Sequence, residues 1–305
     1  MILVRRCAEG KDYTEPFSKG ILSRSIIRAE LEPSKAYELA NKIESDLVEK
    51  GISLISTEDL VKRIVELLEE ENPLLAENYL NWRKIRKTDE PLIILIGGVS
   101  GVGTSSISYE ISRKLGIKSM INTDMIREVM RKILSKELSP VIHESSFVAH
   151  KALRVNPPPE FDYVLAGFKD QISTVSVGVE AVMERALTEG ISIIIEGVHI
   201  VPGFIRKDLM EKDNVLMFTL SLDDEEIHRN RLYSRCIDGW GHRPLQKYLD
   251  NFDSIRKIQK YFIDQSAMEG IPNINNVDRV ATIDFIINSI AESYGGLNNV
   301  RKDKS

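Results

Sequence analysis

The amino-acid sequence predicts an α/β fold: a domain with a mostly parallel sheet and a helical lid, preceded by a small, mainly helical module. The apolar run Leu92–Ile96 breaks into a glycine-rich loop and continues as a helix, and later apolar runs alternate with helical patterns. Before residue 88, apolar residues recur mostly at helical spacing. The chain of 305 residues is long enough for two domains, which we place at residues 1–88 and 89–305.

The composition argues against several classes of protein. With 42% hydrophobic and 29% charged residues, the chain resembles an ordinary globular protein, and its net charge of −5 disfavours a nucleic-acid or membrane-surface binder. No long apolar stretch follows the N-terminal arginines, so we expect neither a signal peptide nor a membrane span. Cys7 and Cys236 lie far apart without metal-type spacing, which indicates free thiols in a reducing cytoplasm.

The first module is predicted to contain a short strand, Ile2–Val4, and four helices. Polar residues that favour N-caps precede the first three helical patterns, and a proline follows the third. Residues 88–91 are the expected linker to the second domain. In chain order, the helices are expected to start at Ser18, at Ser34, at Ser56 or Thr57, and after Asn72-Pro73.

Residues 98–106 form the candidate phosphate-binding loop. Glycines allow successive backbone N–H groups to turn toward one anion, and the following helix adds the partial positive charge of its N-terminus. Gly98, Gly103 and Ser105 fit the pattern G-x-x-x-x-G-K-[ST]. The predicted nucleotide-binding residues are Gly98, Val99, Ser100, Gly101, Val102, Gly103, Thr104, Ser105 and Ser106.

The lysine position of this pattern holds Thr104. A lysine–phosphate contact contributes about 1.5–3 kcal/mol, so its loss weakens nucleotide binding unless another group replaces it. The Thr104 hydroxyl can donate one hydrogen bond, and an arginine of the lid or Lys169 can supply the charge. The alternative is an inactive nucleotide-binding domain.

The next strand leads into a helix that carries Asp124, Arg127 and Arg131. Thr123 or Asp124 is expected as its N-cap, but Asp124 also lies at the carboxyl end of a strand, where open α/β sheets bind ligands. Arg127 and Arg131 are four residues apart and share a helix face, where they can hold a phosphate. The alternative for this pair is a solvated surface.

The segment 135–163 is irregular and polar, which is typical of a lid or substrate loop. A helix follows over Val164–Leu187, and then a buried strand, Ile191–Ile195. Glu196, directly after that strand, suits the acidic position that orders a water on Mg²⁺. His199 is interpreted as a hydrogen-bonding loop residue rather than a catalytic base.

An arginine-rich helix, Glu225–Ile237, follows the strand Val215–Leu220. Such a helix is typical of a kinase lid, which closes over the transferred phosphoryl group. Arg231 and Arg235 share one face, whereas Arg229 points elsewhere and is expected to pair with an acidic residue. A charged surface helix is the alternative. A long helix over Tyr248–Met268, a strand at Ile271–Asn276 and a closing helix complete the domain.

The first module resembles the ATP-cone, a regulatory nucleotide-binding domain, over nearly its full length. The resemblance implies phosphate contacts by basic residues near the first helix, which nominates Lys19 and Arg24. A solvated basic face is the alternative. The matching stretches are Pro16–Lys19, Leu22–Ser25, Ile55–Leu60 and Ala76–Tyr79.

The whole chain resembles the archaeal 2-phosphoglycerate kinases, lysine-less loop included, in the stretches Gly97–Ser105, Asn122–Arg131, Ile195–Gly203 and Ile271–Ile274. The resemblance implies transfer of the ATP γ-phosphate to the 3-hydroxyl of 2-phosphoglycerate, in the biosynthesis of cyclic 2,3-diphosphoglycerate. Its partners are then ATP and a small anionic phosphorylated acid, and the oligomeric state is open.

This reaction gives each candidate residue a role. Asp124 orients or deprotonates the acceptor hydroxyl, and Ser105 and Glu196 hold Mg²⁺ or another divalent cation. The acceptor-binding residues are Asp124, Arg127, Arg131 and Lys169, and the catalytic residues are Asp124, Arg231, Arg235 and Glu196. The alternatives are a kinase of another acceptor, such as a nucleoside or seryl-tRNA, and a non-enzymatic nucleotide sensor.

Overall fold

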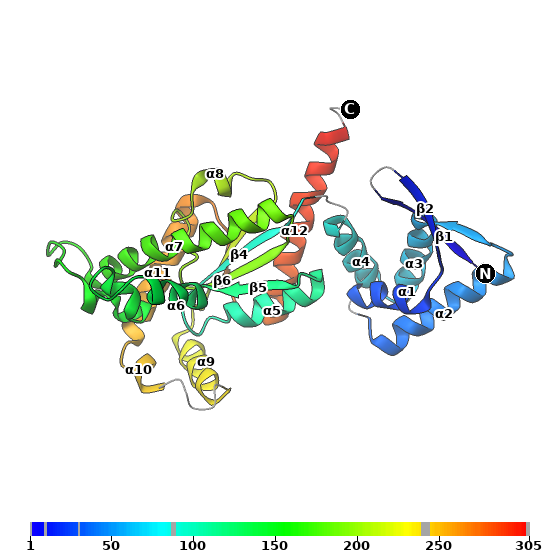
Figure 1. Cartoon of the computed structure of the whole chain (residues 1–305). Helices are drawn as coiled ribbons and strands as arrows, with labels where there is room; N and C mark the ends of the chain where they lie inside the picture. The colour runs from blue at the N-terminus through cyan, green and yellow to red at the C-terminus, as the bar shows by residue number, and fades with distance from the viewer. Residues whose placement is uncertain (1, 9–10, 30, 87–89, 239–244, 303–305) are drawn as a thin grey trace. The chain divides into compact units, whose positions relative to one another are not determined.

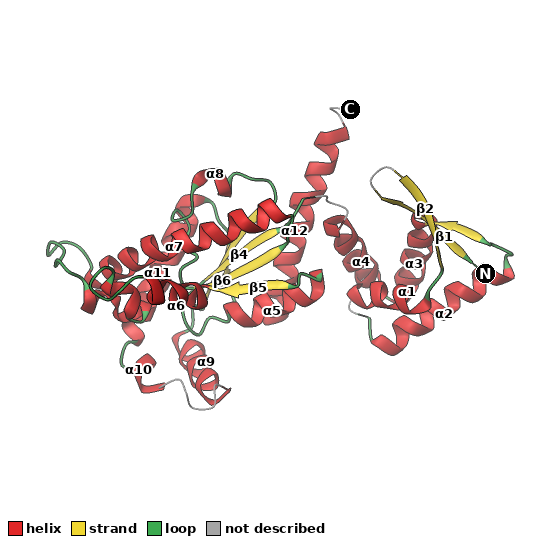
Figure 2. Ribbon diagram, viewed as in Figure 1, coloured by secondary structure: helices red, strands yellow, loops and turns green. Residues whose placement is uncertain are grey.

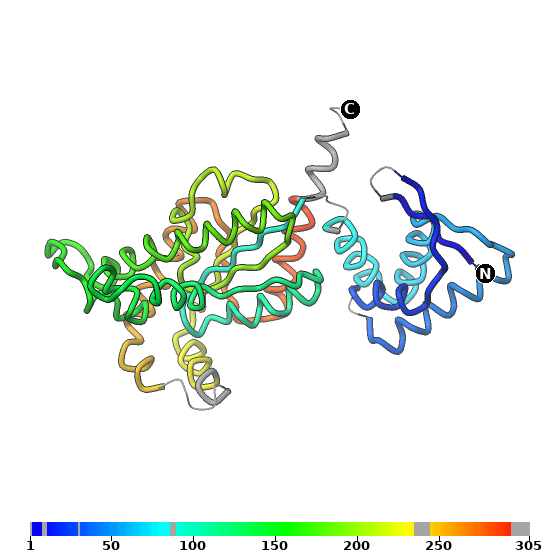
Figure 3. Tube along the Cα trace, in the orientation of Figure 1, coloured from blue at the N-terminus to red at the C-terminus, as the bar shows by residue number. Residues whose placement is uncertain are grey.

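The computed structural model describes residues 2–8, 11–29, 31–86, 90–238 and 245–302, and its Cα trace is shown in Figure 3. The chain divides into two compact units, Met1–Thr88 and Asp89–Ser305. Within the described ranges, no helix has both the length and the apolar character needed to cross a membrane. Residues 88 and 89 of the predicted linker, and residues 239–244, lie outside the described residues.

The first unit packs helices on a small sheet with the strand order β2-β1-β3. Strand β1 pairs antiparallel with β2 and parallel with β3. Neither β2 nor β3 was predicted, since β2 contains no apolar run and β3 is only three residues long. Its elements are β1 (Leu3–Ala8), β2 (Lys11–Pro16), α1 (Lys19–Ile26), the 3₁₀ helix η1 (Ile27–Ala29), α2 (Pro33–Glu49), β3 (Leu54–Ser56), α3 (Thr57–Glu71) and α4 (Pro73–Arg86).

Two of the predicted N-caps in this unit are confirmed. The side chain of Ser18 accepts a hydrogen bond from the Ile21 N–H, and that of Ser56 accepts one from the Asp59 N–H. The predicted cap Ser34 is wrong, because α2 already starts at Pro33, whose fixed φ suits the first position of a helix. The apolar faces of these helices enclose a core of their own, as their spacing predicted.

The second unit is built on a five-stranded parallel sheet with the order β5-β6-β4-β7-β8 (Figure 1). In its register, Gly97 of β4 pairs with Gly197 of β6, and Asn122 of β5 pairs with Glu196 of β6. Three strands therefore end level with one another. The sheet consists of β4 (Ile93–Gly97), β5 (Ser119–Asn122), β6 (Ile193–Gly197), β7 (Val215–Ser221) and β8 (Asn273–Asn275).

Helices cover both faces of this sheet, with α7 and α11 on one face and α5 and α12 on the other (Figure 2). Alternate residues of β4 are buried on each face; Ile93 and Leu95, for example, pack in one core with Val175 and Val179 of α7. The helices are α5 (Thr104–Leu115), α6 (Thr123–Ile133), η2 (Pro140–His143), η3 (Ser146–Ala152), α7 (Tyr163–Glu189), α8 (Lys207–Met210), α9 (Glu225–Asp238), α10 (Leu245–Leu249), α11 (Phe252–Glu269) and α12 (Arg279–Lys302).

The predicted α/β class with a parallel sheet is confirmed, with local corrections. The N-cap of α6 is Asn122, not Thr123 or Asp124, because the Asn122 side chain accepts from the Met125 N–H. The expected helix from Tyr248 is two helices, α10 and α11. The segment expected to be irregular contains the 3₁₀ helices η2 and η3.

Candidate active site

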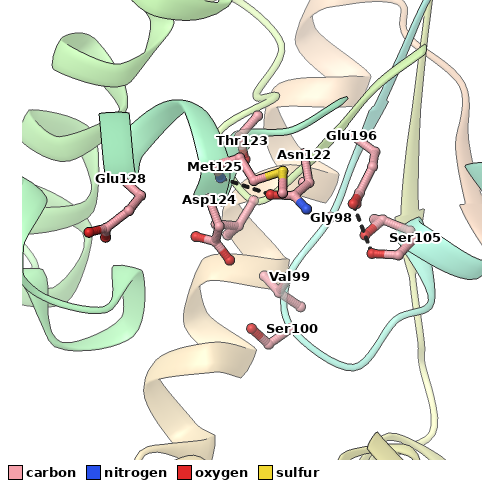
Figure 4. Close-up of a pocket in the computed structure, with 13 residues that line it drawn as sticks. Gly98, Val99, Ser100, Ser105, Asn122, Thr123, Asp124, Met125, Glu128 and Glu196 are labelled. Atoms are coloured by element: carbon pink, nitrogen blue, oxygen red, sulfur yellow. Dashed lines mark hydrogen bonds between the residues drawn. The ribbon is translucent and has the colours of Figure 1, made fainter. Parts of the chain in front are cut away.

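A cavity of about 340 Å³ opens where β4, β5 and β6 end (Figure 4). Ser105 and Glu196 lie on one side of it and Asp124 on the other. The site therefore forms at the carboxyl edge of a parallel sheet, where such folds bind ligands. The lining residues are Gly98, Val99, Ser100, Thr104, Ser105, Asn122, Thr123, Asp124, Met125, Glu128, Glu196, Gly197 and Val198.

The loop between β4 and α5 needs its glycines. Gly101 has φ +94°, and a β-carbon there would lie 2.8 Å from Leu232 Cδ2 and 3.0 Å from the ring of His228. Gly103, at φ +98°, stands at the N-cap position of α5. A side chain at either position would be strained, although neither glycine lines the cavity.

Ser105 and Glu196 form the pair that the sequence nominated for a metal. The Ser105 hydroxyl donates to Glu196 Oε1 at 2.8 Å, and Glu196 is only 3% exposed. Mg²⁺ in phosphoryl-transfer sites takes one or two protein oxygens and completes its shell with phosphates and water. The described residues contain no cluster of three or more His, Cys, Asp or Glu for a metal, but this hydroxyl–carboxylate pair suits Mg²⁺ held in that way.

Thr104 lines the cavity, and none of the described residues that line it is a lysine or an arginine. Lys169, one candidate for the missing charge, lies on α7 with Nζ 4.7 Å from the ring centroid of Tyr261. Arg231 reaches the loop itself: its guanidinium donates to the Val102 carbonyl at 3.3 Å and to the Val277 carbonyl at 3.1 Å. The side chain of Arg235 lies outside the described residues.

Asp124 and Arg127 lie together at the N-terminal end of α6. Arg127 Nη2 is 3.2 Å from Asp124 Oδ1, and the Arg127 side chain, 15% exposed, also donates to the carbonyls of Ile142 and Glu144. Asp124 lines the cavity, whereas Arg127 does not. Arg131 does not line the cavity and donates to Glu128 at 2.7 Å.

Helix α9 and the loop after β8 contact the candidate phosphate-binding loop from outside the cavity. His228 Nε2 is 2.8 Å from the Ser100 carbonyl, and Asn276 Nδ2 donates to the Val102 carbonyl at 2.7 Å. The Ser100 carbonyl can only accept, so His228 donates to it through Nε2, and burial lowers the pKa of this imidazole, which favours its neutral form. Sequence reasoning missed both residues, because neither has a local pattern that signals a contact with the loop.

Among the described residues, no acidic side chain pairs with Arg229, contrary to the expectation. Its guanidinium lies over the ring of Phe252, 3.8 Å from the centroid, in a cation–π contact. An aromatic ring that is remote in sequence is the partner here, which helix periodicity cannot reveal.

His199 is fully buried in the loop after β6. Its ring contacts Thr123 Oγ1 and Gln171 Oε1, so it is a hydrogen-bonding residue, as interpreted from the sequence. Burial lowers its pKa to about 4, which keeps it neutral in neutral solution.

The two nominated residues of the first unit both lie on α1. Lys19 Nζ is 3.0 Å from Glu44 Oε2, and Arg24 Nε donates to the Gly20 carbonyl at 3.0 Å. Both side chains are occupied by contacts within their own unit.

Comparison with known proteins gives matches to both parts of the chain. Residues 9–88 match the family model of the ATP cone domain, as the resemblance indicated. A 2-phosphoglycerate kinase of Methanothermobacter thermautotrophicus is 57% identical over 96% of this chain and 96% of its own length. The proteins of the same name from Methanopyrus kandleri and Methanocaldococcus jannaschii are 45% and 42% identical, each over 93% of this chain and over 86% and 90% of their own lengths.

Proposed function

This chain belongs to the 2-phosphoglycerate kinase family, and we propose that it transfers the γ-phosphoryl group of ATP to the 3-hydroxyl of 2-phosphoglycerate, forming 2,3-bisphosphoglycerate. The observation that carries the proposal is the cavity: a glycine loop with the Ser105–Glu196 pair on one side faces the carboxylate of Asp124 on the other.

The loop 98–106 is proposed to bind the ATP phosphates. Its backbone N–H groups and the N-terminus of α5 offer hydrogen bonds and partial positive charge to an anion. Ser105 and Glu196 would hold Mg²⁺ or another divalent cation, which neutralises charge on the β- and γ-phosphates. Glu196 also keeps the Ser105 hydroxyl pointing toward the cavity side of the loop.

Asp124 is proposed to face the hydroxyl of the acceptor. Its contact with Arg127 fixes the direction of the carboxylate, so that one oxygen can accept the hydroxyl proton. Arg127, Arg131 and Lys169 remain the proposed ligands of the acceptor's phosphate and carboxylate groups. Arg127 and Arg131 each contact a residue that lines the cavity, Asp124 and Glu128 respectively, whereas binding by Lys169 requires an approach of its side chain to the acceptor.

Two arginines of α9 are proposed to replace the absent lysine of the loop. Arg231 already contacts the loop at the Val102 carbonyl, and Arg235 follows it one turn later on the same helix. Rotation of the Arg231 guanidinium toward the cavity would place positive charge beside the phosphates. We further propose that the first unit binds a regulatory nucleotide through Lys19 and Arg24.

The test is ADP release from ATP and Mg²⁺ with 2-phosphoglycerate as the acceptor. We expect turnover that depends on this acceptor, and a second phosphoester on C3 of the product in ³¹P NMR spectra. 3-Phosphoglycerate, whose hydroxyl and phosphate are exchanged, serves as the matched control. Absence of ADP release with 2-phosphoglycerate would contradict the proposal, and equal turnover with 3-phosphoglycerate would contradict the acceptor assignment.

A further inference from the structure

A chain of buried hydrogen bonds joins the acceptor side of the cavity to the helices behind it. His199 Nδ1 is 2.9 Å from Thr123 Oγ1, and His199 Nε2 is 3.0 Å from Gln171 Oε1. Thr123, Gln171 and His199 are all fully buried. These hydrogen bonds thus connect the first residue of α6, the loop after β6 and the N-terminal half of α7.

The partners of these three side chains determine which atom donates and which accepts in each hydrogen bond. Gln171 Nε2 donates to the carbonyls of Val141 and Glu144, so its Oε1 faces the imidazole and can only accept. His199 Nε2 must therefore carry the proton, and Nδ1 must accept from the Thr123 hydroxyl. The Thr123 oxygen accepts in turn from the His199 N–H at 3.4 Å. Burial lowers the pKa of the imidazole, which favours this neutral form.

Both ends of the chain lead to the residues assigned to the acceptor. At one end Thr123 directly precedes Asp124, which lines the cavity. At the other end the Glu144 carbonyl that Gln171 holds also accepts from Arg127, and Arg127 contacts Asp124 at 3.2 Å. Two routes therefore lead from the His199 imidazole to Asp124, one through Thr123 and the other through Gln171 and Arg127.

Two glycines allow α6 to approach β6 and α7 closely enough for the hydrogen bonds of His199 to form. A β-carbon on Gly197, at φ +133°, would lie 2.4 Å from Thr123 Oγ1, and one on Gly178 of α7 would lie 2.6 Å from Ile126 Cγ2 of α6. Helix α6 therefore packs against β6 and α7 without room to shift. Such close packing is typical of a rigid support for a site.

We infer that His199 is a positioning residue for phosphoryl transfer: through Thr123 and Gln171 it sets the direction of the Asp124 carboxylate and of the Arg127 guanidinium. The inference rests on the proposed function of the cavity. His199 does not line the cavity, so it acts on the acceptor through these neighbours and not by contact. The loss of its hydrogen bonds should affect the acceptor more than ATP, because the phosphate-binding loop lies outside the chain of bonds.

The test compares three substitutions of His199 in the full-length enzyme. Asparagine places an acceptor near the Nδ1 position and keeps the hydrogen bond to Thr123. Glutamine places a donor near the Nε2 position and keeps the hydrogen bond to Gln171. Alanine keeps neither hydrogen bond. We expect His199→Ala to lower kcat/KM for 2-phosphoglycerate by about tenfold or more, with the KM for ATP nearly unchanged. His199→Asn should restore mainly kcat, and His199→Gln mainly the KM of the acceptor.

Ser266→Ala is the matched control, because it also removes a buried hydrogen bond. That bond joins Ser266 Oγ to Thr219 Oγ1 at 2.7 Å, and neither residue lines the cavity. This control should lower the stability of the fold without changing the KM for the acceptor relative to the KM for ATP. If His199→Ala does not fold, Thr123→Val and Thr123→Ser provide the same comparison, since only serine keeps the hydroxyl. Serine should retain kcat and valine should lose it.

The inference is overturned if the wild-type enzyme turns over 2-phosphoglycerate while all folded variants of His199 and Thr123 keep its kcat and both KM values. It is also overturned if both KM values change together, as for a general loss of stability. If the wild-type enzyme does not turn over 2-phosphoglycerate, the proposed function is wrong, and the inference that rests on it is wrong as well.

Discussion

The Ser105 hydroxyl donates a 2.8 Å hydrogen bond to Glu196, although the two residues lie 91 positions apart in the sequence. The contact forms because β4 and β6 are neighbours that end level with each other, so the start of α5 meets the end of β6. A carboxylate that is 3% exposed needs such a partner, and the same pair presents two oxygens to the proposed cation.

The first prediction concerns the charge of this carboxylate. Glu196→Gln keeps the size and can still accept from Ser105, but it removes the negative charge that a divalent cation requires. We expect kcat to fall about a hundredfold or more and the Mg²⁺ concentration for half-maximal rate to rise. Initial rates over a Mg²⁺ titration measure both. Glu211→Gln, at an exposed position, is the control and should keep the wild-type rate; an unchanged Mg²⁺ dependence in Glu196→Gln would exclude this residue from the cation site.

The second prediction concerns Arg127. Arg127→Ala removes the ion pair with Asp124 and the bonds to the Ile142 and Glu144 carbonyls. We expect the KM for 2-phosphoglycerate to rise about tenfold or more, since a charged hydrogen bond contributes about 1.5–3 kcal/mol, and the KM for ATP to change much less. Steady-state kinetics with each substrate varied in turn provide the measurement. Arg113→Ala, on the exposed side of α5, should alter neither KM, and equal effects of Arg127→Ala on both would remove Arg127 from the acceptor side.

The third prediction separates backbone strain from steric overlap in the phosphate-binding loop. Gly101 and Gly190 both have positive φ, but a β-carbon meets Leu232 and His228 at Gly101 and nothing within 4 Å at Gly190. Each alanine should lower the free energy of unfolding by about 1–3 kcal/mol through strain. Only Gly101→Ala should also raise the KM for ATP, because only there must the loop move. Denaturant unfolding and ATP kinetics test the pair, and a normal KM for ATP in Gly101→Ala would show that the loop tolerates the shift.

The fourth prediction concerns pH. His199 has its pKa lowered to about 4, mainly by burial, with opposing influences of Asp124 and Arg127. The folded protein therefore binds fewer protons than the unfolded chain between pH 4 and about 6.5. The stability from the neutral imidazole is fully present above about pH 6.5 and is lost as the pH falls toward 4, a loss on the order of 3 kcal/mol. Urea unfolding from pH 7.5 to 4.5 should show this decline, and it should be smaller in His199→Asn. Equal declines in both proteins would assign the loss to other groups.

The fifth prediction concerns the first unit. If Lys19 and Arg24 bind phosphates, the full-length protein should bind two equivalents of a non-hydrolysable ATP analogue, and the double alanine variant should bind one. Isothermal titration measures the stoichiometry. Lys35→Ala, which removes an exposed charge from α2, is the control and should keep two sites. A single site in the wild-type protein would contradict the proposed regulatory role.

Local patterns were sufficient for the elements that lie in one stretch of chain. The buried strand before Gly98, the glycine loop and the helix after Thr104 follow from apolar runs, glycine spacing and helical periodicity, and they occur where expected. The cap of α6 was assigned one or two residues too late, because Asn122, Thr123 and Asp124 all have side chains that can cap a helix.

The contacts that hold the site together were beyond local reasoning. His228 reaches Ser100 across 128 positions, and Lys169 lies over Tyr261 rather than beside the loop. These partners depend on which helices cover which face of the sheet, and the periodicity of a single helix contains no information on that. The roles of all the nominated site residues remain predictions, and the side chain of Arg235 lies outside the described residues.

The two hydrogen bonds to the Val102 carbonyl determine when the glycine loop can form during synthesis of the protein. It accepts from Arg231 and from Asn276, residues 129 and 174 positions further along the chain. During synthesis on the ribosome the glycine loop is complete long before either donor exists. The loop can therefore reach its final hydrogen-bonded form only after residue 276 has left the exit tunnel, so nascent chains that end earlier lack these two contacts of the glycine loop.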